Sequence, residues 1–154
     1  MSNLEHLFQN KELLQTALTH RSYLNENPSW KHDHNERLEF LGDAVLELVV
    51  TQYLYLNYPN PEGEMTNWRA ALVNSVMLSK VAGKINLNDS LLLSRGEAKD
   101  TGRARQYILA NAVEAVIGAL YLDQGYEAAK KFVMQYVMDE LQGIFEYKSY
   151  RDAK

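Results

Sequence analysis

Three carboxylates are spaced along one short segment so that a helix would align them. Glu36, Glu39 and Asp43 stand at positions i, i+3 and i+7, which share one helical face over about 10 Å, at ~1.5 Å per residue. Aligned carboxylates repel one another and resist removal from water, so a half-buried set needs protons, arginine partners or a divalent cation. Oxygen ligands of this kind suit magnesium or manganese.

The residues around these carboxylates bear on two interpretations. A solvated acidic face on a surface helix would account for the three acids alone. The segment 38–56 is, however, among the most apolar of the chain and leaves little of a helix for solvent. Gly42 would let another backbone approach closely. The pattern therefore favours a metal site.

A second apolar segment, 108–123, carries another polar pair at helical spacing. Asn111 and Glu114 stand at i and i+3, on one face of a helix. Taken singly, they could be a helix cap and a solvated acid. If the two helices cross, they bring together oxygen atoms that could form part of the shell of a hard cation. The candidate metal ligands are Glu39, Asp43, Asn111 and Glu114.

Residues 35–43 read Asn-Glu-Arg-Leu-Glu-Phe-Leu-Gly-Asp, which resembles the signature of the ribonuclease III endonuclease domain. Further segments resemble that family in order and spacing, and together they cover essentially the whole chain. They are 13–23 for its first helix, 62–73 for its central helix, 93–97 for a connecting loop and 108–125 for the helix that completes the active site.

The resemblance implies an all-α helical fold and magnesium-dependent hydrolysis of double-stranded RNA, with manganese as a substitute cation. The products would carry 5′-phosphate and 3′-hydroxyl ends with short 3′ overhangs. It implies that Glu39, Asp43 and Glu114 are metal-site carboxylates, with Asp43 and Glu114 catalytic. It also implies that Glu36 and Glu62 line the cleavage valley.

Asn111 departs from the resemblance, because the family usually has an aspartate there. An amide oxygen can ligate a cation but adds no negative charge, so we expect weaker metal binding. Three explanations stay open: native variation tolerated at higher magnesium, an engineered change, and a noncatalytic module that dimerises and binds structured RNA.

Phe40 follows Glu39 and is expected to point away from the carboxylates. The resemblance implies that this aromatic enters a pocket on a second subunit of a symmetric homodimer, which would suit the twofold character of a duplex. The alternative is a buried core aromatic.

A basic segment precedes the second acidic helix. Between residues 95 and 105 the basic side chains outnumber the acidic ones, although the whole chain has a net charge of −4. Phosphate contacts are normally made by lysine and arginine, so this segment is the candidate RNA contact; a solvated charged loop is the alternative. The residues are Arg95, Lys99, Arg103 and Arg105.

Length and composition agree with one intracellular domain. The chain has 154 residues, 46% of them hydrophobic, and no cysteine, which excludes disulfides and thiolate metal sites and fits a reducing cytosol. No secretory signal and no membrane-length apolar run is recognisable. We expect a cytoplasmic protein without membrane contact.

Apolar residues recur at three-to-four spacing almost throughout, and alternation typical of strands is absent. The predicted helices are 4–19, 36–56, 65–85, 107–124 and 127–147, with a short helix at 89–93. The domain is expected to span 1–147. Residues 148–154 resemble the start of a linker to a double-stranded-RNA-binding domain, and such a domain does not follow in this sequence.

A rival metal site is conceivable at residues 31–34, which read Lys-His-Asp-His. A His-Asp pair occurs in metal-dependent phosphohydrolases, but no other segment supplies matching ligands. His20 is expected to end a helix or to pack.

Overall fold

Helices form nearly all of the regular structure. The computed structural model describes residues 4–145. Within that range no strand forms, and the one isolated β-bridge joins Thr19 to Leu92. The predicted all-α class is confirmed. In chain order the helices are η1 (Glu5–Leu7), α1 (Lys11–Ala17), α2 (Arg21–Glu26), α3 (Glu36–Asn57), α4 (Glu62–Val73), α5 (Ser75–Lys84), η2 (Leu87–Asp89), α6 (Arg95–Lys99), α7 (Arg103–Gln124), α8 (Tyr126–Tyr136) and η3 (Met138–Glu140).

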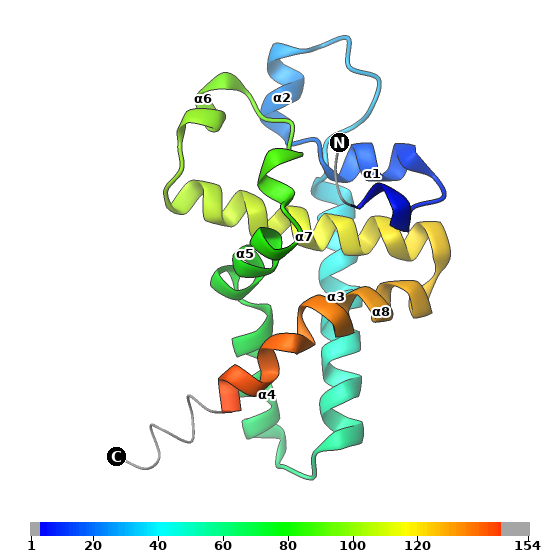
Figure 1. Ribbon diagram of the computed structural model, residues 1–154, viewed down its shortest axis with the longest axis vertical. Coiled ribbons are helices and arrows are strands. Elements are labelled where there is room, and N and C mark those ends of the chain that lie inside the picture. The colour runs from blue at the N-terminus through cyan, green and yellow to red at the C-terminus, as the bar shows by residue number, and fades with distance from the viewer. Residues whose placement is uncertain (1–3, 146–154) are drawn as a thin grey trace.

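The two longest helices, α3 and α7, have 22 residues each and cross near the middle of the molecule (Figure 1). Glycines stand at the crossing. A Cβ on Gly42 would lie 1.6 Å from the carbonyl oxygen of Glu114, and one on Gly118 would lie 2.3 Å from the carbonyl oxygen of Leu38. Only glycine allows backbones to approach this closely, so the close approach predicted at Gly42 is confirmed.

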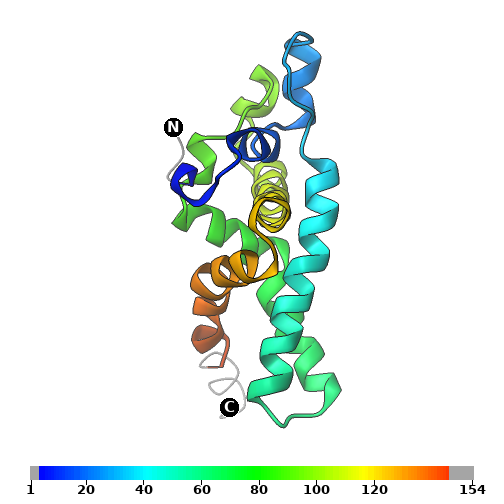
Figure 2. The same ribbon diagram turned by 90° about the vertical axis from the view of Figure 1, so that its right-hand side faces the viewer.

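The apolar face of α3 packs into the core and its other side remains exposed. Figure 2 shows α3 along one side of the molecule, with α7 seen nearly end-on beside it. The central part of α7 is buried almost all round, as expected for a helix enclosed by others. The buried apolar residues of α3 are Leu38, Val45, Leu46, Val49, Val50 and Leu54.

The single helix predicted over 65–85 is wrong, because the chain turns at Asn74. Its backbone is extended (φ −71°, ψ 166°), and its Oδ1 accepts a hydrogen bond from the Met77 N–H at 2.9 Å. Asparagine side chains compete in this way with the helical ladder and cap the helix that follows. The result is two helices, α4 and α5.

The helix predicted over 4–19 is likewise divided. Asn10 separates η1 from α1, and its Oδ1 accepts from the Glu12 N–H at 3.0 Å. The helix expected over 89–93 is also wrong. The chain instead forms η2, which reaches only the first residue of that segment, and α6 after it; Ser94 caps α6 by accepting the Glu97 N–H at 3.1 Å.

The C-terminal helix predicted over 127–147 begins as expected but is interrupted. α8 ends at Tyr136, η3 follows, and residues 141–145 are helical again. Its apolar residues Phe132, Val133, Val137 and Leu141 are buried in the core. The proposed linker, 148–154, lies outside the described residues.

Candidate active site

An acidic pocket opens where α3 and α7 cross. Its volume is about 590 Å³. The first two turns of α3 supply three carboxylates and an aromatic ring, and the middle of α7 supplies an amide and a fourth carboxylate. The lining residues are Glu36, Glu39, Phe40, Asp43, Asn111 and Glu114.

The carboxyl of Glu114 hydrogen-bonds to that of Asp43 across the crossing. Burial raises the pKa of Glu114 to about 9, and the bond to Asp43 and the charges of Asp43, Glu39 and Glu47 add to the shift. Burial also raises the pKa of Glu39, with further contributions from Glu36 and Asp43. Without a cation, the pocket therefore holds a proton on Glu114 at neutral pH.

The donor set fits a hard divalent cation. All its potential ligands are carboxylate or amide oxygens, which magnesium and manganese prefer. Among the described residues, no group of three His, Asp or Glu side chains is already arranged to hold an ion. The carboxyls of Asp43 and Glu114 are hydrogen-bonded to each other, and Glu114 would have to release its proton for the pair to ligate a cation together.

Asn111 lies in the middle of α7 and lines the acidic pocket. The alternative that it caps a helix is wrong, because the helix begins eight residues earlier, at Arg103. The alternative that Glu114 simply points to water is also wrong, since Glu114 is half-buried and bonded to Asp43. The crossing of the two helices thus brings the four candidate ligands into one place.

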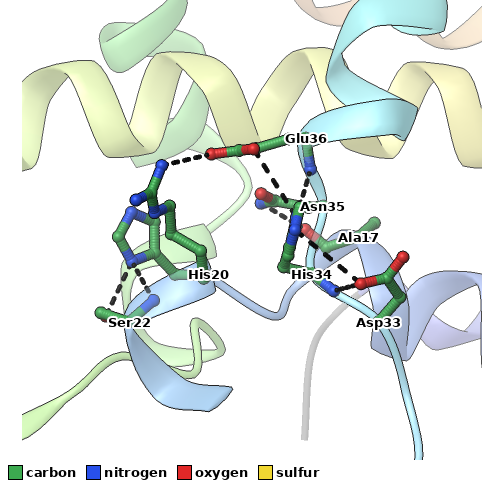
Figure 3. Close-up of polar contacts among 8 residues, drawn as sticks. Ala17, His20, Ser22, Asp33, His34, Asn35 and Glu36 are labelled. Carbon is green, nitrogen blue, oxygen red and sulfur yellow. Dashed lines mark hydrogen bonds and ion pairs between the residues drawn. The ribbon is translucent and has the colours of Figure 1, made fainter. Parts of the chain in front are cut away.

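The carboxylate of Glu36 is held at the start of α3 (Figure 3). Its Oε1 lies 3.3 Å from the Nη1 of Arg21, and its Oε2 lies 3.9 Å from the Nδ1 of His34. Glu36 also donates its backbone N–H to that His34 nitrogen at 3.3 Å. These contacts link the pocket to α2 and to the loop before α3.

His20, in the same view, is a helix-end residue as predicted. It precedes α2, and its Nδ1 accepts from the Ser22 N–H at 3.2 Å. The rival metal site at residues 31–34 does not form: the ring of His32 packs against Trp30 with centroids 5.3 Å apart, while His34 bonds to Glu36.

Phe40 is 84% exposed. A core aromatic is therefore excluded for the single chain. The expectation that it points away from the carboxylates is also wrong, because Phe40 is one of the residues that line the acidic pocket. It forms an apolar edge beside the candidate ligands.

Glu62 does not join the acidic pocket of its own chain. It begins α4, beyond the far end of α3, and lines a second, largely apolar pocket of about 370 Å³. The other residues of this second pocket are Thr51, Leu54, Tyr55, Met65, Thr66 and Arg69.

The basic segment is not uniform. Arg95, Lys99 and Arg103 are exposed, but Arg105 is only 8% exposed, so its prediction as an RNA contact is corrected. Its Nη1 donates to Asn88 Oδ1 at 2.6 Å, and its Nη2 donates to the carbonyls of Glu97 and Ala98 at 2.9 and 3.1 Å. Arg105 holds α6 against the start of α7.

Sequence reasoning missed Glu47, whose charge contributes to the raised pKa of Glu114. Its carboxylate pairs with Arg69 of α4 at 3.0 Å. The signal was present, because Glu47 extends the column of Glu36, Glu39 and Asp43 by four positions.

No helix within residues 4–145 has both the length and the apolar character needed to cross a membrane.

The helical fold is one that solved nuclease domains share. The structure is similar to the nuclease domain of ribonuclease III from Campylobacter jejuni, with a TM-score of 0.78 and 41% identity over 89% of this chain and 97% of that one. It is also similar to part of Dicer from Giardia intestinalis, with a TM-score of 0.63 and 25% identity over 82% of this chain and 16% of that one.

The family model for ribonuclease-III-like domains matches residues 10–141. Ribonuclease 3 of Staphylococcus saprophyticus is 46% identical over 97% of this chain, and that of Staphylococcus aureus strain JH9 is 45% identical over the same share. The chain belongs to the ribonuclease III family. It spans 64% of the length of these two relatives.

Proposed function

We propose that this chain is the nuclease domain of a magnesium-dependent endoribonuclease that cuts double-stranded RNA, leaving 5′-phosphate and 3′-hydroxyl ends with short 3′ overhangs. One observation carries the proposal: a family member holds the half-buried carboxyl of Glu114 against the carboxyl of Asp43, at a crossing that needs glycine on both helices. A half-buried acid held against a second carboxyl destabilises a fold unless a function keeps it.

The proposed ligands are Glu39, Asp43 and Glu114, with the amide oxygen of Asn111 as a neutral fourth. When bound, magnesium or manganese supplies charge neutralisation at the scissile phosphate and a lowered pKa for the attacking water. The chain contributes by releasing the Glu114 proton and by holding the carboxylates rigidly on two packed helices. No covalent enzyme nucleophile is required.

The proposed RNA contacts outside the acidic pocket are Arg95 and Lys99 of α6. Both are exposed, so they can meet backbone phosphates, which supply most of the sequence-independent affinity for nucleic acid. Proteins recognise duplex RNA mainly by its A-form shape. The cellular role that we propose for this domain is the processing of RNA precursors that contain such duplexes. The absence of cysteine fits work in the cytoplasm.

We further propose a symmetric homodimer formed along α3. The exposed face of this helix carries Phe40 near its start, Leu48 near its middle and Tyr55 near its end, which are 84%, 55% and 75% exposed. Two antiparallel copies of α3 would meet at Leu48 and place each Phe40 at the second pocket of the other subunit. The Campylobacter jejuni nuclease domain likewise has a region involved in dimer formation.

This arrangement would also bring Glu62 of one subunit to the cleavage valley of the other. Glu62 lines the second pocket, so Glu62 of the partner subunit would come close to Phe40 and Glu36. The position of Glu62, which a single chain leaves far from the acidic pocket, then agrees with the implied cleavage-valley role.

Phe40→Ala is expected to weaken the dimer at least roughly tenfold, because a buried aromatic anchor commonly contributes ~2 kcal/mol or more. Sedimentation velocity over a concentration series measures the effect. Leu122→Ala, which removes another exposed apolar side chain (55% exposed) from the C-terminal end of α7, is the control. A wild-type protein that stays monomeric throughout the series would contradict the proposal.

A second candidate function is a noncatalytic module that dimerises and binds structured RNA. Asn111 favours it, because the pocket has one charge fewer than an aspartate would supply. The retained Asp43 and Glu114 pair favours the enzyme.

Asn111→Asp decides between them. An added carboxylate in this partly buried pocket should strengthen binding of a divalent cation about tenfold, even after the cost of crowding it near Asp43. We expect the magnesium needed for half-maximal cleavage of an end-labelled duplex of about thirty base pairs to fall by that factor. Cleavage by the variant alone identifies an inactive natural pocket, and binding without cleavage by either protein supports the noncatalytic module.

A further inference from the structure

A third pocket lies on a different side of α7 from the acidic pocket. It opens between α5 and the start of α7, at the left end of α7 in Figure 1, and has a volume of about 370 Å³. Gln106 and Leu109 face it, five positions before Asn111 and Glu114, which is about 140° around a helix. The residues that line it are Ser79, Thr101, Gly102, Arg103, Arg105, Gln106 and Leu109.

Arg105 brings a buried positive charge to this pocket without a negative partner. Its side chain bonds to the amide oxygen of Asn88 and to two backbone carbonyls, and its Nε has no hydrogen-bond acceptor among the described residues. No Asp or Glu of the described range forms an ion pair with it. Buried charges are normally compensated by an opposite charge, so an anion near Arg105 would be stabilising.

The start of α7 adds to this positive character. The helix has 22 residues, and Gly102 before it provides no side-chain cap. Its first backbone N–H groups and the positive end of its dipole therefore remain available. Arg103 is exposed and forms no ion pair among the described residues, and the hydroxyls of Ser79 and Thr101 are further donors in the wall.

No carboxylate lines the pocket. The nearest one in sequence is Asp100, whose Oδ1 accepts the Gly102 N–H at 3.1 Å. Asp100 therefore accepts the N–H of Gly102, which precedes the helix, and leaves the first N–H groups of α7 itself without a side-chain acceptor from the described residues. An exposed arginine, two hydroxyls and a helix N-terminus are donors of the kind that recognise tetrahedral oxyanions, and the buried Arg105 adds a positive charge beside them.

We propose that this third pocket binds a phosphate group, at a place distinct from the metal-dependent cleavage site. The bound phosphate would accept hydrogen bonds from Arg103 and the first N–H groups of α7 and would compensate the charge of Arg105. Since Arg105 also fastens α6, occupancy would stabilise the basic segment. The phosphate could belong to a free or terminal monoester or to a backbone diester.

The test is a titration of the isotope-labelled protein with inorganic phosphate, in EDTA and at constant ionic strength, followed by the amide resonances of Gly102 to Arg105. We expect saturable shifts confined to this turn. Arg103→Glu should weaken phosphate binding at least roughly tenfold, because it replaces the exposed donor by a repelling charge. Lys131→Glu changes net charge equally from an exposed position on α8 and should leave binding within about twofold.

A second titration with dimethyl phosphate distinguishes the sources. Tighter binding of inorganic phosphate indicates a monoester ligand, and equal binding indicates a backbone diester. Shifts that never saturate, or equal weakening in both variants, would overturn the proposal. Because metal and cleavage play no part in the readout, failure here is separate from failure of the proposed nuclease function.

Discussion

Glu114→Gln is expected to slow cleavage of duplex RNA by roughly a thousandfold or more, the factor that corresponds to losing about 4 kcal/mol of transition-state stabilisation. Glutamine keeps the shape of the side chain and can still hydrogen-bond to Asp43, but it cannot take on the negative charge that a cation requires. With Asn111 already neutral, only Asp43 and Glu39 would remain as charged ligands. Single-turnover cleavage across a magnesium titration measures the loss.

Stability against pH separates this loss of chemistry from a loss of fold. The pKa of Glu114 is raised to about 9 from an ordinary value of 4.5, so the folded chain holds a proton that the unfolded chain has released. In EDTA, the free energy of unfolding should therefore fall as pH rises through that window. Magnesium should restore it at the alkaline end.

The glutamine variant supplies the matched control for this pH dependence. It has no proton to lose, so its stability in EDTA should change much less between pH 5 and pH 9, the window set by the two pKa values of Glu114. At the alkaline end it should exceed that of the wild-type protein. A variant that cuts RNA normally, or that is unfolded at pH 8, would contradict the assignment of Glu114.

Gly118→Ala is expected to destabilise the fold by ~3 kcal/mol or more, at the upper end of the cost of overpacking. Its methyl group would stand 2.3 Å from the carbonyl oxygen of Leu38 and 2.9 Å from the backbone nitrogen of Gly42. Backbone atoms cannot move aside as a flexible side chain can, so α3 and α7 would have to separate. Separation would also pull Asp43 away from Glu114.

Gly83→Ala is the control for this substitution, because nothing lies within 4 Å of the added Cβ. Gly83 lies inside α5 and is exposed, so alanine should stabilise the helix by about 0.5–1 kcal/mol. Urea unfolding in EDTA compares the three proteins. If both alanine variants changed stability equally, the close crossing would not be the source of the effect.

The two helices that carry the candidate site could be predicted from the sequence because their signals are local. Periodicity along 36–56 and 107–124 indicated α3 and α7, and i, i+3 and i+7 spacing placed the acids on common faces. The predictions failed where a single side chain overrides periodicity. Asn74 bonds to a backbone N–H and divides one apolar run into two helices, an effect that apolar spacing alone does not reveal.

Contacts between distant segments decided the remaining features. Arg95 and Arg105 look alike in the sequence, yet the fold leaves one in solvent and buries the other against α6. Likewise, Glu36 and Glu62 were expected in one cleavage valley. Within one chain, however, Glu36 begins α3 and Glu62 lies just beyond the other end of that helix, so the length of α3 separates them.

By itself, then, the sequence determined the helical class, the faces of α3 and α7 that carry oxygen ligands and the need for a glycine at residue 42. Each of these depends on spacing within one helix, which the geometry of the backbone sets. Only the tertiary structure decided that Glu114 meets Asp43 and holds a proton, that Arg105 is buried without a negative partner and that Phe40 is exposed. Those properties depend on burial and on charges brought together from distant segments, and no local pattern encodes them.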